Sequence, residues 1–477
     1  MNRYITTTLP YVNGDPHIGF ALEIVQADAL ARLWRASGDA VFFNTGTDEH
    51  GQKIYEAAEK KGQSVQEYVD HYAEEFKKLY DALDLSNDGF IRTTDQRHIE
   101  AAQEMWRRCF EAGDIYEKTY SGLYCVGCEA FKTEHELTEE GTCELHPTLK
   151  PQEFSEKNYF FALSKYQDKL LEYLKRPSVV IPEWRREEAI QFIQKGLEDI
   201  SISREKERLT WGVPVPGDDT QVMYVWFDAL TSYISTLDWP QKDGNFDTFW
   251  NKGAVLQMAG KDQVRFQSVL WQAMLMSADV KTSDAVFYHG FINSGGQRMS
   301  KSTGNIISPY DLVSKYGTDA TRYLLLRHAH PVDDSDVTWE RLDEWYTANL
   351  VNGLGNLVAR VMKLAEDNLT PADTTSARVE EEVARRMNEF RFNEALDTVF
   401  EMIAECDAVM TDRAPFRKVK SEDDALREEG KQDIALLVQH LIRIAKSVEA
   451  VMPRTSALIL EAIAENKKPE NLFPRLA

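Results

Sequence analysis

The sequence has few of the features that mark a specialised class of protein. Its 477 residues include only five cysteines, which excludes a disulfide-stapled scaffold. No run of about 18 uncharged apolar residues occurs, so we expect no membrane-spanning helix. The first residues show neither the apolar run of a secretion signal nor the Arg- and Ser-rich pattern of a transit peptide. We therefore expect a soluble, cytoplasmic protein whose thiols stay reduced.

Two familiar nucleotide-binding motifs and an excess of positive charge are also missing. Neither G-x-G-x-x-G nor G-x-x-x-x-G-K-[ST] occurs. The net charge of −23 argues against nonspecific nucleic-acid binding. A specific complex needs only a local basic patch, and Arg413, Arg417, Lys418 and Lys420 form such a cluster. A solvated charged loop is the alternative interpretation of this cluster.

What is present is the pattern of an α/β protein followed by a helical one. Hydrophobic residues make up 43% of the chain, enough for large buried cores, and the length predicts about three domains. Residues 4–9 and 40–45 are typical of strands, and they flank a helix predicted from 17 to about 36. The same alternation returns at 254–288, and long helical patterns follow after about 340.

This pattern predicts a split Rossmann-like domain with a doubly wound parallel sheet, a zinc-knuckle insertion and a final all-α domain. The predicted limits are 1–114 and 216–290 for the two halves of the Rossmann-like domain, 115–215 for the insertion, 291–340 for a loop region and 341–477 for the helical domain.

The insertion contains a metal-binding pattern. Cys125 and Cys128 are separated by two residues, and Cys143 and His146 repeat that spacing, with 14 residues between the two pairs. Three thiolates and an imidazole in two short knuckles make a closed tetrahedral zinc site, which is structural because no coordination position stays open. Cys109 lies outside this spacing, as does Cys406, and we expect both in hydrophobic cores.

The loop Pro10–Phe20 links the first predicted strand to the helix that begins at His17. Ligands of open α/β sheets bind at this edge, where backbone N–H groups and the helix dipole attract phosphate. Gly19 costs about 1 kcal/mol against alanine within a helix, which indicates a close approach to the backbone. A histidine near a helix start is also a common capping residue, so that alternative stays open.

A second loop, Arg298–Asn305, follows the late strand and the pair Gly295-Gly296. Its two cations and its hydroxyl groups suit a mobile clamp on a triphosphate. A flexible basic loop without a ligand is the alternative.

Taken together, the two loops resemble the signatures of class I aminoacyl-tRNA synthetases. The further stretches Gly46–Gly51, Tyr224–Ala229, Gly260–Asp262 and Asn349–Asn356 are similar to those of the methionyl-tRNA synthetase family in particular. The resemblance runs from about residue 4 to residue 465.

The resemblance implies attachment of L-methionine to tRNA(Met) through a methionyl-adenylate. ATP would be a substrate together with Mg²⁺, and one structural Zn²⁺ would lie in the insertion. The chain shows no appended module of the kind that dimerises some relatives, so a monomer is expected.

The resemblance also assigns roles to residues at matching positions. The expected catalytic residues are His17, Lys261 and Lys301. The expected ATP contacts are His17, Gly19, Lys261, Asp262, Arg298, Ser300 and Lys301. The expected amino-acid pocket consists of Leu9, Tyr11, Asp48, Trp226, Ala229, Tyr233, Gln263 and Gln267, with Asp48 holding the substrate's amino group.

The final helical region is expected to read the anticodon. Asn349, Asn352, Asn356 and Arg360 form a polar stripe at helical spacing, and amides and guanidinium groups can read unstacked RNA bases. The family resemblance selects Asn356 and Arg360 from this stripe and adds Phe416. A solvated helix face is the alternative interpretation of the stripe.

Several positions depart from the family pattern. Phe20 cannot hydrogen-bond ATP, Arg298 replaces the usual lysine, and Phe416 stands where a tryptophan is usual. Gln263 and Gln267 replace an apolar residue and a histidine, and their spacing of four predicts a mutual amide–amide bond. These departures leave two alternatives open: a class I paralogue of altered amino-acid specificity, and a non-catalytic tRNA-binding paralogue.

Overall fold

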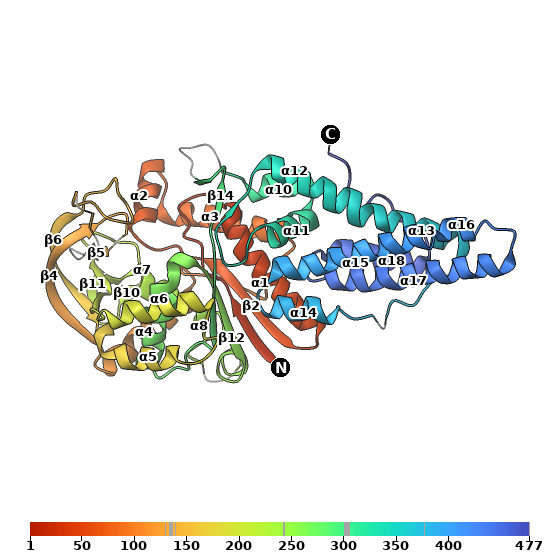
Figure 1. The fold of residues 1–477 in the computed structure, drawn as a ribbon. Coiled ribbons are helices and arrows are strands. Elements are labelled where there is room, and N and C mark those ends of the chain that lie inside the picture. The colour runs from red at the N-terminus through yellow and green to blue at the C-terminus, as the bar shows by residue number, and fades with distance from the viewer. Residues whose placement is uncertain are drawn as a thin grey trace. The chain divides into compact units, whose positions relative to one another are not determined.

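The computed structural model describes residues 1–128, 130–132, 137–138, 140–241, 244–299, 306–375 and 377–476. The chain forms two compact units, each described here by itself (Figure 1). The first unit contains residues 1–15, 39–78 and 87–289, and the second contains 16–38, 79–86 and 290–477. Within the described ranges, no helix has the length and apolar character needed to cross a membrane.

The first unit is built on a six-stranded parallel sheet, as the alternation of strands and helices predicts. Its strand order is β3-β2-β1-β12-β13-β7. The bounds are β1 Asn2–Thr6, β2 Ala40–Thr47, β3 Gly89–Arg92, β7 Val180–Ile181, β12 Ala254–Gly260 and β13 Ala285–His289. The Rossmann-like fold class is therefore confirmed, and β7 joins the sheet from within the range predicted as the insertion.

Two small antiparallel sheets complete the strands of this unit. One has the order β5-β4-β6-β8, with β4 Ile115–Cys125, β5 Ala130–Lys132, β6 Gln152–Phe161 and β8 Ile200–Ser201. The other has the order β10-β11-β9, with β9 Ser203–Glu205, β10 Pro214–Val215 and β11 Asp218–Met223. All of these strands except β11 lie within residues 115–215, the range predicted as the insertion.

Helices from residue 96 onward in the first unit contribute to one hydrophobic core. Tyr4, Trp106, Phe227, Trp250 and Trp271 are among its large buried side chains. The helices are α2 Gln52–Lys61, α3 Val65–Ala82, α4 Gln96–Glu111, α5 Gln167–Leu174, α6 Glu183–Gln194, α7 Val225–Leu230, α8 Ser232–Ser235 and α9 Trp271–Ser277. The last residues of α3 belong to the second unit.

The second unit is mainly helical, and α13, α15, α17 and α18 run alongside one another in it (Figure 1). Its helices are α1 Ile18–Ala36, α10 Pro309–Tyr316, α11 Thr318–His328, α12 Trp339–Trp345, α13 Asn356–Asn368, α14 Glu381–Asn388, α15 Phe392–Asp412, α16 Pro415–Lys418, α17 Asp424–Val448 and α18 Pro453–Glu465. A small sheet contains β14 Ile292–Ser294, β15 Gln297–Arg298 and β16 Ser335–Asp336.

Candidate functional site

A pocket of about 100 Å³ lies in the first unit, at the carboxyl ends of its first two parallel strands. It is lined by Tyr11, Asp48, Lys53, Cys128, Val225 and Trp226. The chain after β1 runs beside the end of β2: the Val12 amide donates to the Asp48 carbonyl at 3.1 Å, and the Asp48 amide donates to the Pro10 carbonyl at 2.9 Å. Ligands of open α/β sheets bind at this edge.

The residue after Asp48 anchors this side of the pocket. Glu49 is fully buried, and its carboxylate accepts two hydrogen bonds from Arg92, at 2.7 and 2.9 Å. The Glu49 amide donates to the Thr93 hydroxyl at 2.9 Å, and the Trp211 indole donates to the Glu49 carbonyl at 2.6 Å. Because a bidentate pair restricts both partners, the backbone that carries Asp48 is held in one arrangement.

Val225 and Trp226, the first two residues of α7, also line the pocket. The ring of Trp226 stacks on that of Phe266, with centroids 3.9 Å apart and planes only 8° apart. Phe266 begins a π-helical turn, η5 (Phe266–Leu270), which continues into α9. Of the predicted pocket residues, Tyr11, Asp48 and Trp226 therefore meet at one pocket, while Lys53 and Val225 were not anticipated.

The remaining predicted pocket residues do not line this pocket. Ala229 and Tyr233 are buried and Leu9 is half-buried. The Gln267 amide group donates to the Tyr233 hydroxyl, which joins two of these residues directly. Gln263 lies in a short 3₁₀ turn and donates to Asp262 at 3.1 Å.

The predicted amide–amide bond between Gln263 and Gln267 is wrong. The 3₁₀ and π-helical turns replace the α-helical spacing on which it depended, and each amide instead uses its N–H₂ group elsewhere. The Oε1 atoms of both glutamines are buried and accept no hydrogen bond within the described part of the chain.

The predicted nucleotide loop is divided between the two units: residues 10–15 belong to the first, and residues 16–20, with the start of α1, belong to the second. His17 is exposed and is the N-cap of α1, where its Nδ1 accepts a hydrogen bond from the Phe20 amide at 3.4 Å. A Cβ on Gly19 would lie 3.3 Å from two atoms of the His17 ring. The close approach predicted at Gly19 is thus made, in this structure, by the imidazole of His17.

The other predicted nucleotide contacts are only partly described. Lys261 is half-buried and Asp262 is exposed, directly after β12. Arg298 ends β15, and nothing is described of its side chain. Ser300 and Lys301 lie outside the described residues.

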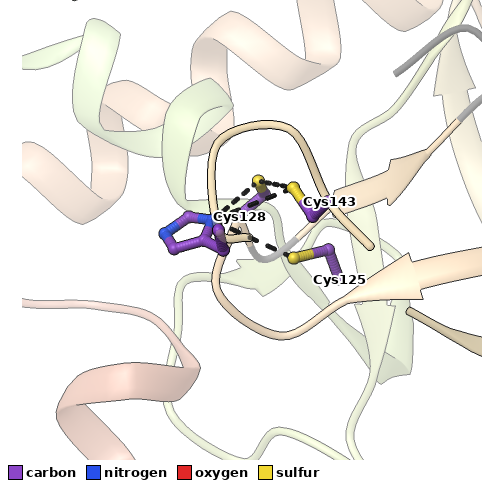
Figure 2. Close-up of side chains that lie close together, drawn as sticks. Cys125, Cys128 and Cys143 are labelled. Carbon is purple, nitrogen blue, oxygen red and sulfur yellow. Dashed lines mark hydrogen bonds between the residues drawn. The ribbon is translucent and has the colours of Figure 1, made fainter. Parts of the chain in front are cut away.

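The predicted metal ligands come together in a single cluster (Figure 2). One ligand atom from each of Cys125, Cys128, Cys143 and His146 lies within 4.8 Å of the others. The distances from His146 Nδ1 to the three sulfur atoms are 4.0, 3.3 and 3.9 Å, and two of the sulfur atoms are 3.4 Å apart. Tetrahedral coordination with metal–sulfur bonds of about 2.3 Å places ligand atoms about 3.5–3.8 Å from one another, so this cluster could hold a metal ion.

A glycine makes this arrangement possible. A Cβ on Gly127 would lie 2.6 Å from Cγ of His146 and 2.7 Å from Cδ1 of Leu149. Atoms do not approach this closely, so the imidazole reaches the cysteines only because residue 127 has no side chain.

The residues predicted to read the anticodon all lie in the second unit. Asn356 and Arg360 are both exposed on α13, and Arg360 pairs with Asp407 at 3.0 Å. Phe416 is 38% exposed, so its ring is accessible. The Arg417 guanidinium lies 5.7 Å from the centre of its ring.

The predicted stripe and basic patch need correction. Residues 346–355 form a π-helix, η6, and the predicted stripe fails at Asn349, which is half-buried and contacts His328, whereas Asn352 is exposed. In the basic cluster, Asp433 accepts from both Arg413 and Lys418, at 2.9 and 2.6 Å. The patch is therefore less positive than its sequence indicates.

One buried cluster in the first unit was not predicted. Asp228 accepts from Nδ1 of His50 and from Nε2 of His98, each at 2.7 Å. Burial alone raises the pKa of Asp228, but the two imidazoles outweigh this effect and hold the pKa at about 2. His50 and Asp228 belong to motifs noted in the sequence, but no local pattern connects either of them to His98.

Comparison with known proteins gives concordant matches. Residues 3–150 and 143–362 match the sequence family described as tRNA synthetases class I (M). A methionine–tRNA ligase of Fusobacterium nucleatum is 36% identical, over 99% of this chain and 76% of the relative, and one of Rickettsia felis is 37% identical, over 99% and 94%. The methionyl-tRNA synthetase of Mycobacterium tuberculosis, solved in complex with methionyl-adenylate, superposes with a TM-score of 0.90 at 35% identity, over 97% of this chain and 96% of that one.

Proposed function

This chain belongs to the methionyl-tRNA synthetase family of class I tRNA synthetases, and on that premise we propose how its residues carry out the reaction. The enzyme activates methionine with ATP to form methionyl-adenylate, and it then transfers the methionyl group to tRNA.

We propose that the pocket between Asp48 and Trp226 receives methionine. Its one carboxylate, Asp48, suits the positively charged amino group of the substrate, and the rings of Tyr11 and Trp226 suit its apolar side chain. The observation that supports this proposal best is the convergence of Tyr11, Asp48 and Trp226, which are distant in sequence, on one pocket at the carboxyl edge of the parallel sheet. Tyr233 and Gln267 would contact the substrate farther along its side chain.

We infer the nucleotide contacts from the two signature loops. In the first step the methionine carboxylate attacks the α-phosphate of ATP, and pyrophosphate leaves. Negative charge shifts toward the pyrophosphate, so cations that meet it at that moment accelerate the step. His17, Lys261 and Lys301 are the proposed catalytic residues; Gly19, Asp262, Arg298 and Ser300 are further ATP contacts. Mg²⁺ accompanies ATP.

We propose that the metal in the cysteine cluster is zinc. Three sulfur donors and one imidazole are a typical structural zinc set, and among the residues that the structure describes no carboxylate, which harder cations prefer, belongs to the cluster. When bound, the ion would join the two knuckles and supply no chemistry to the reaction. Cys125, Cys128, Cys143 and His146 would hold it.

We propose that Asn356, Arg360 and Phe416 contact the anticodon of tRNA(Met). An exposed aromatic ring flanked by a guanidinium is a suitable stacking platform for an unpaired base. We further propose that the enzyme is cytoplasmic and that it is a monomer. Light scattering of the purified protein would test the oligomeric state.

ATP–pyrophosphate exchange with each amino acid in turn tests the assignment of the pocket. Methionine should be the best substrate. Asp48→Asn should raise KM for methionine at least about tenfold, because the ammonium group loses its charged partner. Asp247→Asn, which removes the carboxylate of an ion pair with Lys252, is the control and should behave as the parent. Faster exchange with another amino acid would contradict the assignment, and no exchange at all would favour a non-catalytic tRNA-binding protein.

A further inference from the structure

A buried hydrogen-bonded chain lies behind the proposed methionine pocket. It consists of His50, Asp228, His98 and Ser235, and we refer to it as the histidine–aspartate chain. His50 and His98 each lie 2.7 Å from Asp228, and Nδ1 of His98 lies 2.9 Å from the hydroxyl of Ser235. All four residues are at most 5% exposed.

The members of this chain come from four separate elements. His50 follows β2, Asp228 lies on α7, His98 lies on α4 and Ser235 ends α8. Asp228 is separated from His50 by 178 residues and from His98 by 130. The chain therefore connects segments that no local hydrogen bonding brings together.

Three members of the chain stand two positions after a proposed pocket residue. His50 follows Asp48, Asp228 follows Trp226, and Ser235 follows Tyr233 by the same interval. On a helix, side chains two residues apart project about 200° apart. The carboxylate of Asp228 and the indole of Trp226 therefore leave α7 on opposite sides, so the chain lies behind the pocket wall rather than in it.

We propose that His50, Asp228 and His98 are positioning residues, which hold the Asp48, Trp226 and Tyr233 segments in the arrangement that binds methionine. An ionised carboxylate can only accept, so both ring nitrogens that face Asp228 must carry a proton, and this fixes the orientation of both imidazoles. When a pocket is already held in its binding arrangement, less free energy is lost in ordering its side chains as the ligand binds, so the affinity is higher. The inference rests on the proposed pocket for methionine.

Hydrophobic packing alone does not account for the chain. A buried charged group costs desolvation free energy, and apolar side chains of similar volume often give equal or greater stability. The histidine–aspartate chain supplies directional hydrogen bonds between segments, which apolar side chains do not provide.

The first unit contains a matched control for this inference. Asp114 is also buried, and it accepts hydrogen bonds from Tyr166 and, at 2.8 Å, from Ser277. It lies in none of the segments that form the pocket. Asp114→Asn therefore measures what the loss of a buried, hydrogen-bonded carboxylate does to stability alone.

The experiment compares Asp228→Asn with Asp114→Asn in ATP–pyrophosphate exchange, together with their melting temperatures. Asp228→Asn should raise KM for methionine about tenfold or more, while KM for ATP stays within about twofold of the parent. Asp114→Asn should lower the melting temperature and leave both KM values within about twofold. Equal effects of the two variants on KM for methionine would overturn the proposal.

Further variants guard against misfolding and against a wrong pocket. His98→Gln keeps an N–H donor for Asp228 and should retain a lower KM for methionine than His98→Leu; equal KM values would contradict the proposal. Ser235→Ala, the mildest change, should raise KM for methionine about two- to fivefold even if Asp228→Asn does not fold. An unchanged KM would contradict the positioning role of the histidine–aspartate chain.

Trp226→Ala distinguishes failure of the proposed methionine pocket from failure of the positioning role. If it leaves KM for methionine unchanged, the pocket is wrong; if it raises KM while Asp228→Asn does not, only the positioning role is wrong.

Discussion

Asp28 and Arg322 form an ion pair of 2.6 Å in which both side chains are completely buried. Arg322 on α11 also donates to the carbonyl groups of Leu83, Ala450 and Val451, at 3.0, 3.0 and 2.7 Å. One guanidinium therefore joins α1 and α11 to two backbone segments of the second unit, and it satisfies buried acceptors that would otherwise be costly.

Arg322→Met should strongly destabilise the second unit. The change leaves the Asp28 carboxylate and three backbone carbonyls without this donor, and breaking a buried pair typically costs about 3–5 kcal/mol. Arg443→Met is the control, because the Arg443–Glu380 pair is about half exposed on the arginine side and should contribute about 1 kcal/mol or less. Urea unfolding followed by circular dichroism compares the two, and equal losses would show that burial of Arg322 contributes nothing.

Metal analysis of the purified protein should find one zinc ion per chain. Cys125→Ala removes one of four ligands, so metal should be lost and residues near the cluster should exchange amide hydrogens faster. Cys406→Ala is the matched control, because Cys406 is also buried but lies outside the cluster. Protein that is purified without chelator and contains no zinc would contradict the assignment of the metal.

Lys301→Ala should slow adenylate formation far more than it weakens ATP binding. A cation that meets the triphosphate only as charge develops acts on the transition state, so kcat should fall about 10²–10³-fold with little change in KM. Lys315→Ala removes a lysine that instead pairs with Asp343, and exchange should be unaffected. A rise in KM for ATP with unchanged kcat would show that Lys301 is a ground-state contact.

The strands and the metal ligands could be predicted because each depends on a local pattern. The strand predicted at 40–45 coincides closely with β2, and the helix after His17 ends at Ala36 as expected. The spacing of Cys125, Cys128, Cys143 and His146 is likewise local, and the cluster forms.

What could not be predicted depends on tertiary context. β7 has only two residues, Val180 and Ile181, too few to show any periodicity. The π-helical turns at 266–270 and 346–355 shift side chains away from the α-helical spacing on which the predicted glutamine pair and asparagine stripe depend. No local sequence pattern indicates a role for His98, because its partner Asp228 is 130 residues away.

Phe416→Ala should weaken tRNA recognition without affecting methionine activation. Stacking on an aromatic side chain contributes about 1–3 kcal/mol per base, so KM for tRNA should rise roughly ten- to a hundredfold. Leu426→Ala truncates another exposed apolar side chain of the same unit and is the control. Normal aminoacylation by the Phe416 variant would show that this ring does not contact the anticodon.

Gln267→Leu should reduce the preference for methionine over norleucine, which lacks the sulfur atom. The Gln267 amide donates to the Tyr233 hydroxyl. We propose that this hydroxyl donates to the sulfur atom of methionine, so Gln267 would orient the donor. A thioether accepts only weakly, so the ratio of kcat/KM values for the two amino acids in exchange should fall about two- to tenfold. The variant also removes the buried Gln267 Oε1, which accepts no hydrogen bond within the described residues. Removing this atom stabilises the fold and offsets part of the stability lost with the hydrogen bond to Tyr233.

Gln263→Leu provides the control for this last change. Its amide bonds to Asp262 rather than to Tyr233, so the substitution should leave the methionine-to-norleucine ratio within about twofold of the parent. If both variants lower the ratio equally, the polarity of the whole segment sets the selectivity. If Gln267→Leu leaves the ratio unchanged, the Gln267–Tyr233 bond supports the fold of the pocket and takes no part in recognising sulfur.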